Sequence, residues 1–245
     1  MTGSVVVTGG GRGIGRAIVE RLRDDGHPVV VIERDAVALP DGAIPVLGDA
    51  SDDEVTEHAA QLAAERAPLT GWVNNAAAFR DASLHDATTS DLLALVTLNL
   101  GVVVSGARAA VRHFLAAGTG GSIVNLSSHQ ARMPVPGCLP YATAKGAIEA
   151  LTRALAVDYG PHGIRANVVA PGSVDTARYR ELGGAHDDEM ARLHPLGRIA
   201  EAGEIADAVA YLLSPRASFI TGVTLPVDGG RTVRGHDPEP PRRTP

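Results

Sequence analysis

Short runs of β-branched and other apolar residues alternate along the chain with longer amphipathic stretches. This alternation is typical of βαβ units on a parallel sheet. The apolar runs predict seven strands, at residues 4–8, 28–32, 44–47, 71–75, 122–126, 165–170 and 223–227. The amphipathic stretches predict helices at residues 13–25, 53–65, 90–117, 141–159 and 201–213. The expected fold class is therefore α/β, with one domain built on a doubly wound, seven-stranded parallel sheet that helices cover on both faces.

Two segments interrupt this alternation. Residues 175–200 are polar and include Gly183, Gly184 and His186, which suits a solvated loop with a short helix. Because the segment leaves the carboxyl end of a predicted parallel strand, where ligands bind in such sheets, we predict a mobile lid over a substrate. Residues 231–245 are rich in proline and charge, so we predict a disordered tail after a catalytic domain at 1–230.

Composition excludes several classes of function. The 245 residues are 44% hydrophobic, which is enough for a core, and the net charge of −6 argues against a nucleic-acid partner. The single cysteine, Cys138, suits a reducing compartment. We expect no signal peptide, no apolar run long enough to span a bilayer, no membrane partner and a cytoplasmic location. The histidines show no metal-ligand spacing, so no metal site is expected.

A glycine-rich loop follows the first predicted strand and opens the first helix, with the sequence Thr8-Gly9-Gly10-Gly11-Arg12-Gly13-Ile14-Gly15. Glycines let the backbone turn tightly and approach a pyrophosphate, and the helix N-terminus supplies amide donors. A tight turn with no ligand is the alternative. The position at the start of a βαβ unit favours a dinucleotide site and a Rossmann fold.

Glu33 closes the second predicted strand, where an acidic residue would bind the adenosine ribose hydroxyls. A carboxylate there would repel the extra phosphate of NADP, so the expected cofactor is NAD. Arg12 and Arg34 are close enough in sequence to attract that phosphate, which leaves NADP open.

Tyr141 and Lys145 are spaced i, i+4 at the start of a predicted helix, so they share one face. A neighbouring ammonium favours the phenolate, and we therefore expect Lys145 to lower the pKa of Tyr141. An amphipathic helix with one aromatic residue and one solvated lysine is the alternative. Lys145 is the only lysine among 22 basic residues, which favours a chemical role.

Together these motifs resemble the short-chain dehydrogenase/reductase family, in its shorter subfamily, over residues 4–230. Ser128 lies 13 residues before Tyr141, the spacing of the family's catalytic serine, and is preferred to Ser127. Asn99 matches the helix asparagine that holds a relay water in the family. The resemblance thus implies the catalytic set Asn99, Ser128, Tyr141 and Lys145. It also implies cofactor contacts from Gly9, Gly11, Arg12, Gly13, Ile14, Gly15, Glu33, Asp49, Ala50, Asn75, Ala76, Tyr141, Lys145, Pro171, Gly172, Val174 and Thr176.

The residues themselves also allow structural interpretations. Asn99 could bond a backbone carbonyl within its helix, Asp49 could cap the helix that follows it, and His129 is expected on the surface. Trp72 is expected in the core.

The predicted activity is hydride transfer between a nicotinamide cofactor and a secondary alcohol or ketone, with Tyr141 as the acid/base. One alternative is an NADPH-dependent carbonyl or 3-oxoacyl thioester reductase, and another is a non-catalytic NAD-sensing regulator. A sugar-nucleotide epimerase or dehydratase is a third, which would require a separate substrate domain and a longer chain. The expected partner is a small-molecule alcohol or ketone, and the resemblance implies a homotetramer.

Overall fold

The computed structural model describes residues 3–80, 82–181 and 187–235. Its main sheet has seven parallel strands in the order β3-β2-β1-β4-β5-β6-β9. Their bounds are β1 (Ser4–Thr8), β2 (Val29–Glu33), β3 (Ile44–Leu47), β4 (Leu69–Asn74), β5 (Gly121–Leu126), β6 (Ile164–Pro171) and β9 (Thr224–Val227). The strand order reverses between β1 and β4, and ligands bind at such a reversal, outside the carboxyl ends of the strands.

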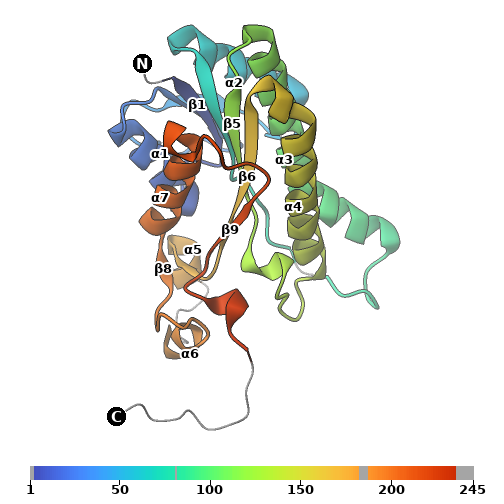
Figure 1. Ribbon diagram of the computed structural model, residues 1–245. Helices are drawn as coiled ribbons and strands as arrows, with labels where there is room; N and C mark the ends of the chain where they lie inside the picture. Colours follow the sequence, from blue (N-terminus) through green and yellow to red (C-terminus); the bar gives the residue numbers. More distant parts are fainter. Residues whose placement is uncertain (1–2, 81, 182–186, 236–245) are drawn as a thin grey trace, which may run out of the picture.

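Helices cover both faces of the sheet (Figure 1). One face carries α1 (Gly13–Asp24) and α7 (Ala202–Leu213), and the other carries α2 (Asp53–Arg66), α3 (Thr89–Ala117) and α4 (Leu139–Tyr159). Alternate residues of each strand point to opposite faces. Val5 and Val7 therefore belong to the core beneath α1 and α7, whereas Val6 belongs to the core beneath the other three helices.

The predicted fold class is confirmed, and the expected helices and main-sheet strands are all present with ends that differ by at most two residues. Pro45 and Pro226 lie in the two edge strands, where a proline removes no ladder hydrogen bond from the sheet interior. Trp72 is fully buried, as expected, and its indole N–H donates to Asn74.

Helix α3 differs from one sequence expectation. Within the described residues it is the one helix long and apolar enough to cross a membrane by length and composition, so the expectation that no apolar run reaches that length was wrong. One side of α3, including Val103, Ala110 and Phe114, is buried against the sheet and its neighbouring helices. This is the arrangement of a core helix.

The segment predicted as a lid lies beyond the carboxyl ends of the strands (Figure 1). It contains β7 (Val174–Asp175), α5 (Ala177–Glu181), α6 (Asp187–Arg192) and β8 (Ala200–Glu201), and β7 and β8 form a two-stranded parallel sheet. The pairing of β7 with β8 was not predicted, because two-residue strands have no readable periodicity. Gly183, Gly184 and His186 lie outside the described residues. So does most of the predicted tail, although its first residues form a 3-10 helix, Arg231–Val233.

Candidate active site

The loop between β1 and α1 has the geometry of a phosphate cradle. Gly9 and Gly13 adopt positive φ angles of 68° and 51°, a conformation that favours glycine. A Cβ atom on Gly15 would overlap the carbonyl oxygen of Gly9, so helix and loop approach each other too closely for any side chain there. Because α1 begins at Gly13, its unpaired N–H groups and positive dipole end face this loop.

Glu33, at the end of β2, lies against the same loop. Its Oε1 accepts a hydrogen bond of 2.5 Å from the backbone N–H of Gly11. The next residue, Arg34, donates to Asp49 at 2.6 Å, whereas Arg12 is exposed. Asp49 also accepts from the N–H and hydroxyl of Ser51, and these bonds, then Arg34, hold its pKa below the usual value. The carboxylate of Glu33 thus lies against the glycine loop, while the charge of Arg34 is paired.

Asn75 closes the cradle from the end of β4. Its side-chain amide donates to the carbonyl oxygens of Thr8 (3.1 Å) and Gly9 (2.8 Å). The hydroxyl of Thr8 in turn accepts from the backbone N–H groups of Asn75 and Ala76 at 3.0 Å each. These bonds fix the loop after β1 to the loop after β4.

The side chain of Asn99 is engaged with the backbone of Ala78. Its Oδ1 accepts from the Ala78 N–H at 2.9 Å, and its Nδ2 donates to the Ala78 carbonyl at 3.0 Å. Asn99 therefore anchors the chain just after Ala76 to α3. Its part in holding a relay water stays a prediction.

Ser128 and Tyr141 are brought together by β5 and α4. Tyr141 lies in the first turn of α4, with Pro140 beside it, and the Ser128 side chain is near enough to its phenol to lower the pKa of Tyr141 as a hydrogen-bond partner. The Ser128 hydroxyl also accepts from the N–H of Gln130, which leaves its own hydrogen available as a donor. Ser127 is directed elsewhere, since its hydroxyl donates to the Lys145 carbonyl at 3.2 Å. Of the two serines, only Ser128 meets the tyrosine.

Lys145 is buried one turn further along α4. It is 2% exposed, and its Nζ donates to the carbonyl of Leu126, the last residue of β5, at a distance of 2.7 Å. The Nζ lies 5.4 Å from the centroid of the Tyr141 ring. Burial lowers the pKa of Lys145 to about 8. The solvated lysine of the alternative interpretation is therefore ruled out.

The expected effect of Lys145 on Tyr141 was wrong. Burial raises the pKa of Tyr141 well above its usual value, and the hydrogen bond from Ser128 offsets only part of that rise. The i, i+4 spacing placed the ammonium beside the ring, but its N–H bond is directed to Leu126 and not to the phenol oxygen. Tyr141 is thus a protonated phenol at neutral pH, the form that donates a proton.

The loop after β6 is hydrogen-bonded to side chains that lie far from it in the sequence. His194 is 2% exposed, and because its Nδ1 can only donate to the carbonyl of Met190, its Nε2 accepts from the backbone N–H of Ser173 at 3.2 Å. A Cβ on Gly172 would lie 2.9 Å from that same Nε2. The side chain of Thr176 reaches the glycine loop, where its Cγ2 would lie 3.4 Å from a Cβ on Gly13.

The C-terminal segment supplies a second support to this loop. Arg231 donates to the Ser173 hydroxyl at 2.8 Å, and the Gly172 N–H donates to the Val227 carbonyl at 3.0 Å. Asp228 accepts from the N–H groups of Gly230 and Thr232 and so forms the turn that presents Arg231. Residues up to 60 positions apart therefore meet around Gly172 and Ser173.

The expectation that His129 lies on the surface was also wrong, because its side chain is 6% exposed. Its Nδ1 donates to the Pro171 carbonyl at 3.3 Å. Burial, together with the charge of Arg231, lowers the pKa of His129 to about 4, so the ring is neutral at physiological pH. It therefore packs against the loop after β6 instead of facing solvent.

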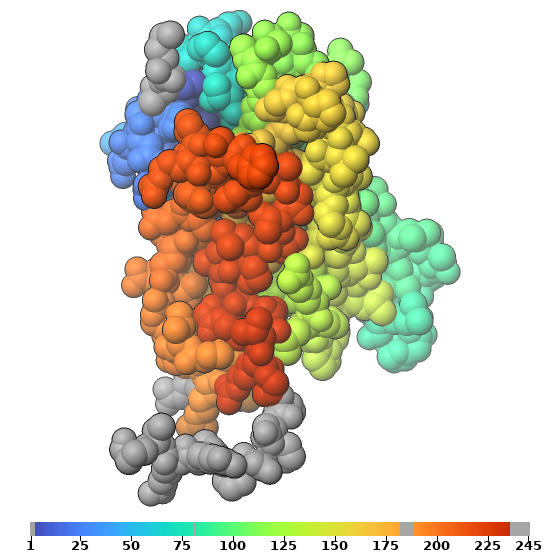
Figure 2. All heavy atoms as spheres, viewed as in Figure 1, coloured from blue at the N-terminus to red at the C-terminus, as the bar shows by residue number. Residues whose placement is uncertain are grey.

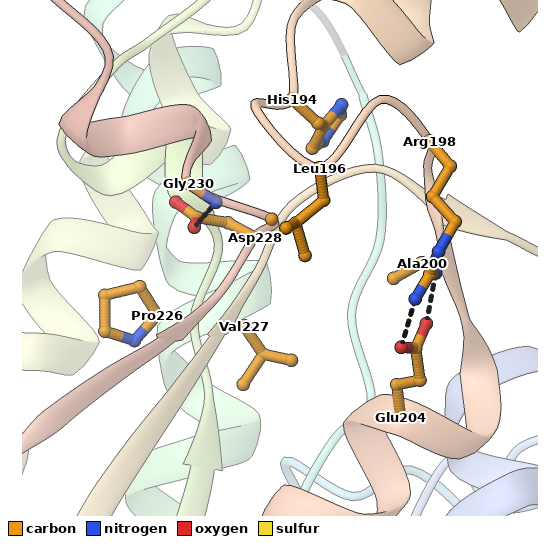
Figure 3. Close-up of a pocket in the computed structure, with 10 residues that line it drawn as sticks. His194, Leu196, Arg198, Ala200, Glu204, Pro226, Val227, Asp228 and Gly230 are labelled. Atoms are coloured by element: carbon orange, nitrogen blue, oxygen red, sulfur yellow. Dashed lines mark hydrogen bonds and ion pairs between the residues drawn. The ribbon is translucent and has the colours of Figure 1, made fainter.

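A pocket of about 200 Å³ adjoins this cluster and is separate from the catalytic group (Figure 3). His194, Asp228 and Gly230 line one side, and the ion pair of Arg198 with Glu204 closes the other. Neither Ser128 nor Tyr141 lines it. Within the described residues, no group of three His, Cys, Asp or Glu side chains is arranged to hold a metal ion.

Comparison with known proteins identifies the family of this chain. A family model described as enoyl-(acyl carrier protein) reductase matches residues 9–232. L-Xylulose reductase of Mus musculus is 35% identical over 233 residues, which cover 92% of this chain and 94% of that protein. The chain belongs to the short-chain dehydrogenase/reductase family.

Two solved structures of this family are close in shape. Aldohexose dehydrogenase of Thermoplasma acidophilum superposes with a TM-score of 0.90 at 29% identity, covering 98% of both chains. Gluconate 5-dehydrogenase of Burkholderia cenocepacia, in complex with NADP and tartrate, gives a TM-score of 0.86 at 32% identity, covering 96% of this chain and 97% of that one. As a short-chain dehydrogenase/reductase, the chain is an NAD(P)-dependent oxidoreductase that acts on CH–OH and C=O groups of small molecules.

The residues present fit a dinucleotide. The cradle at Gly9–Gly15 opens α1, whose first N–H groups have no intrahelical partner, and its backbone is packed too closely for side chains on Gly11 or Gly15. Sequence reasoning identified this cradle and the Ser128–Tyr141–Lys145 group, but it missed His194 and Arg231 as supports of the adjacent loop. No local motif marks either residue, and only the Asp-Gly-Gly turn after the last strand could have suggested the second.

Proposed function

We propose that Tyr141 is the acid/base of this oxidoreductase and that Ser128 binds the oxygen of the reacting alcohol or ketone. The nearness of the two side chains, with a buried Lys145 whose Nζ lies 5.4 Å from the Tyr141 ring centroid, carries this proposal. A carbonyl oxygen placed between them would accept from both hydroxyls, where negative charge develops during reduction. The protonated phenol of Tyr141 is the form needed to donate a proton to that oxygen.

A bound nicotinamide nucleotide supplies or accepts the hydride. The glycine loop would hold its pyrophosphate, Glu33 its adenosine ribose, and the loop from Pro171 to Thr176 its nicotinamide end. Lys145 would hold the nicotinamide ribose. Asp49, Ala50 and Asn75 would complete the adenine side and the floor of the cradle.

Turnover measurements on a panel of compounds test the proposed reaction and its substrate class. The purified chain is assayed with NAD and NADP on sugars, sugar acids, simple secondary alcohols and a 3-oxoacyl thioester. Turnover on sugars and sugar acids is expected, since relatives are named for an aldohexose, gluconate and xylulose. Preference for the thioester would favour the 3-oxoacyl reductase, and binding of nucleotide without any turnover would favour the NAD-sensing regulator.

We further propose that the preferred nucleotide is NAD. Support comes from Glu33, which lies against the glycine loop, and from Arg34, whose charge is paired with Asp49. A gluconate 5-dehydrogenase of the family was solved with NADP, so the preference needs a direct test. Fluorescence titration should show tighter binding of NADH than of NADPH, and Glu33→Ser should narrow that difference. Tighter NADPH binding by the unaltered protein would contradict the proposal.

We also propose a homotetramer in the cytoplasm. The side chains of Val104, Leu115, Val157 and Phe219 are exposed on α3, α4 and the segment before β9. Helix α4 and the C-terminal segment form adjoining parts of one face (Figure 2). Apolar side chains gathered on a surface mark association between subunits. Light scattering on the purified chain should give four times the monomer mass, and a monomer would contradict this assembly.

A further inference from the structure

A cation lies one aromatic ring away from the catalytic phenol. The rings of Tyr141 and Phe79 are stacked, with centroids 4.3 Å apart and planes 27° apart. On Phe79 lies the guanidinium of Arg178, with Cζ 4.2 Å from the ring centroid. Arg178 comes from α5, in the segment beyond the carboxyl ends of the strands, so this segment contacts the catalytic group through Phe79.

The charge of Arg178 has no carboxylate partner among the described residues. The neighbouring Arg180 forms two hydrogen bonds with Asp175, at 2.8 and 2.7 Å, and Arg198 is paired in the same way with Glu204. Arg178 is exposed, and its guanidinium lies on the face of Phe79. Of these three arginines on the segment, Arg178 is the one that contacts Phe79 and the one with no carboxylate partner within the part of the chain that the structure describes.

The stack also covers one face of the Tyr141 ring. Tyr141 is 5% exposed and Phe79 is 44% exposed, so Phe79 is the accessible ring of the pair, and a substrate that approaches Tyr141 from this side displaces it. Displacement of Phe79 removes the aromatic partner of Arg178. A neutral substrate would leave the guanidinium without a new partner, whereas a carboxylate would replace the cation–π contact with charge-assisted hydrogen bonds.

Resting on the proposed function, we infer that Arg178 binds an anionic group of the substrate, so that the preferred substrates are hydroxy acids or keto acids. A guanidinium presents donors in a planar fork that matches a carboxylate. The charge lies on the substrate side of the site, because Arg178 contacts Phe79, which stacks on Tyr141. Thr176, two residues earlier, is the one that meets the glycine loop. The positive charge also acts on the phenol itself, where it opposes the rise in the pKa of Tyr141.

The test uses pairs of compounds in which the acid carries a carboxylate where its neutral partner carries a hydroxymethyl group. The pairs are gluconate with glucitol, tartrate with threitol, and glycerate with glycerol. We expect the unaltered enzyme to show at least a tenfold higher kcat/KM for the acid of the best pair. Arg178→Gln should lose that preference mainly through a higher KM for the acid. Its kcat/KM for the neutral partner and its affinity for NADH should stay within threefold of the unaltered enzyme.

Arg180→Gln is the matched control, because it removes the same charge from the same helix and leaves Arg178 in place. It should keep the preference for the acid. Equal losses on acid and neutral partner in Arg178→Gln, or no preference in the unaltered enzyme, would overturn the inference. Weaker NADH binding in Arg178→Gln would instead assign the residue to the nucleotide.

Calorimetric titration of each acid into the enzyme with NADH separates this inference from the proposed reaction. Binding that Arg178→Gln abolishes, without turnover on any pair, would sustain the anion site and refute the reaction. Turnover on neutral compounds without binding of any acid would support the proposed reaction and refute the anion site. If no compound of any pair binds or reacts, the anion site is wrong.

Discussion

The two halves of the proposed nucleotide site are built in different ways. In the half assigned to adenosine, Gly9 to Gly15 form the cradle, Glu33 bonds Gly11, and Asn75 ties the loop to the end of β4. The half assigned to the nicotinamide is a short loop, Pro171 to Thr176, that His194 and Arg231 hold from distant positions. Glycine φ angles and close backbone packing therefore add to long-range hydrogen bonds in the first half, whereas the second depends on side chains brought from elsewhere in the chain.

This difference predicts different weaknesses. The cradle fails when a side chain is added, because its backbone atoms already lie in contact. The loop fails when a distant side chain is removed, because a buried N–H then loses its acceptor. Substitutions can therefore separate the two halves from each other and from the chemistry between them.

The largest effect is expected between the halves, at Tyr141. Replacing Tyr141 with Phe removes the proton donor and keeps the ring that stacks on Phe79. We expect kcat to fall by on the order of 10³, equivalent to about 4 kcal/mol, with unchanged NADH affinity. Steady-state kinetics and NADH titration measure the two quantities. Turnover near that of the unaltered enzyme would refute the assigned role.

The next effect is on stability, at Lys145. Its pKa of about 8 lies below the 10.5 of a free lysine, so the unfolded chain binds the extra proton between these values. The cost of burying the ammonium is therefore full below pH 8 and disappears by pH 10.5. Unfolding by urea should show that Lys145→Met gains stability relative to the unaltered chain at pH 7, by up to about 3 kcal/mol.

That relative gain should shrink as the pH rises through this window. A difference that stays constant from pH 7 to 10.5 would show that Lys145 is not buried as an ammonium. Unfolding of Arg21→Ala over the same range serves as a control, since its ion pairs with Asp25 and Asp207 are exposed.

Gly15→Ala tests the adenosine half. Its methyl group would overlap the Gly9 carbonyl oxygen, so the cradle must open. We expect NADH binding to weaken by about 2 kcal/mol, or roughly thirtyfold. Gly146→Ala is the control, because space around that helical glycine is open. Equal NADH affinity in the two variants would show that the loop does not bind the nucleotide.

His194→Phe tests the nicotinamide half and carries the smallest expected effect. The Phe ring fills the space but leaves the Ser173 N–H without an acceptor, which costs about 1 kcal/mol in NADH binding, or several-fold in Kd. His194→Gln offers an oxygen to Ser173 and should recover part of the affinity. His27→Phe, at a histidine that bonds Gly3 at the start of β1, should leave NADH binding unchanged.

If His194→Phe and His27→Phe weaken NADH binding equally, His194 supports the fold in general and not the nicotinamide loop. If His194→Gln binds NADH no more tightly than His194→Phe, the hydrogen bond to Ser173 does not contribute to NADH binding. Either result would remove the contrast between the two halves.

Local features of the sequence determined much of this protein. Continuous valine runs placed β1 and β2 within the sheet, the glycine run located the cradle, and the i, i+4 spacing placed Tyr141 and Lys145 on one face of α4. These features depend only on backbone periodicity and on the conformational freedom of glycine, so a few neighbouring residues are enough to read them.

Only the tertiary structure decided the protonation states of these side chains and which distant residues contact them. Burial made Tyr141 a protonated phenol although Lys145 lies beside it, and put His129 inside the molecule. The folded chain also brought His194 to Ser173 and Arg178 to Phe79, across gaps in sequence that no periodicity spans. The physical reason is that desolvation and long-range contacts depend on what the rest of the chain places around a residue, and neighbours in sequence do not set that.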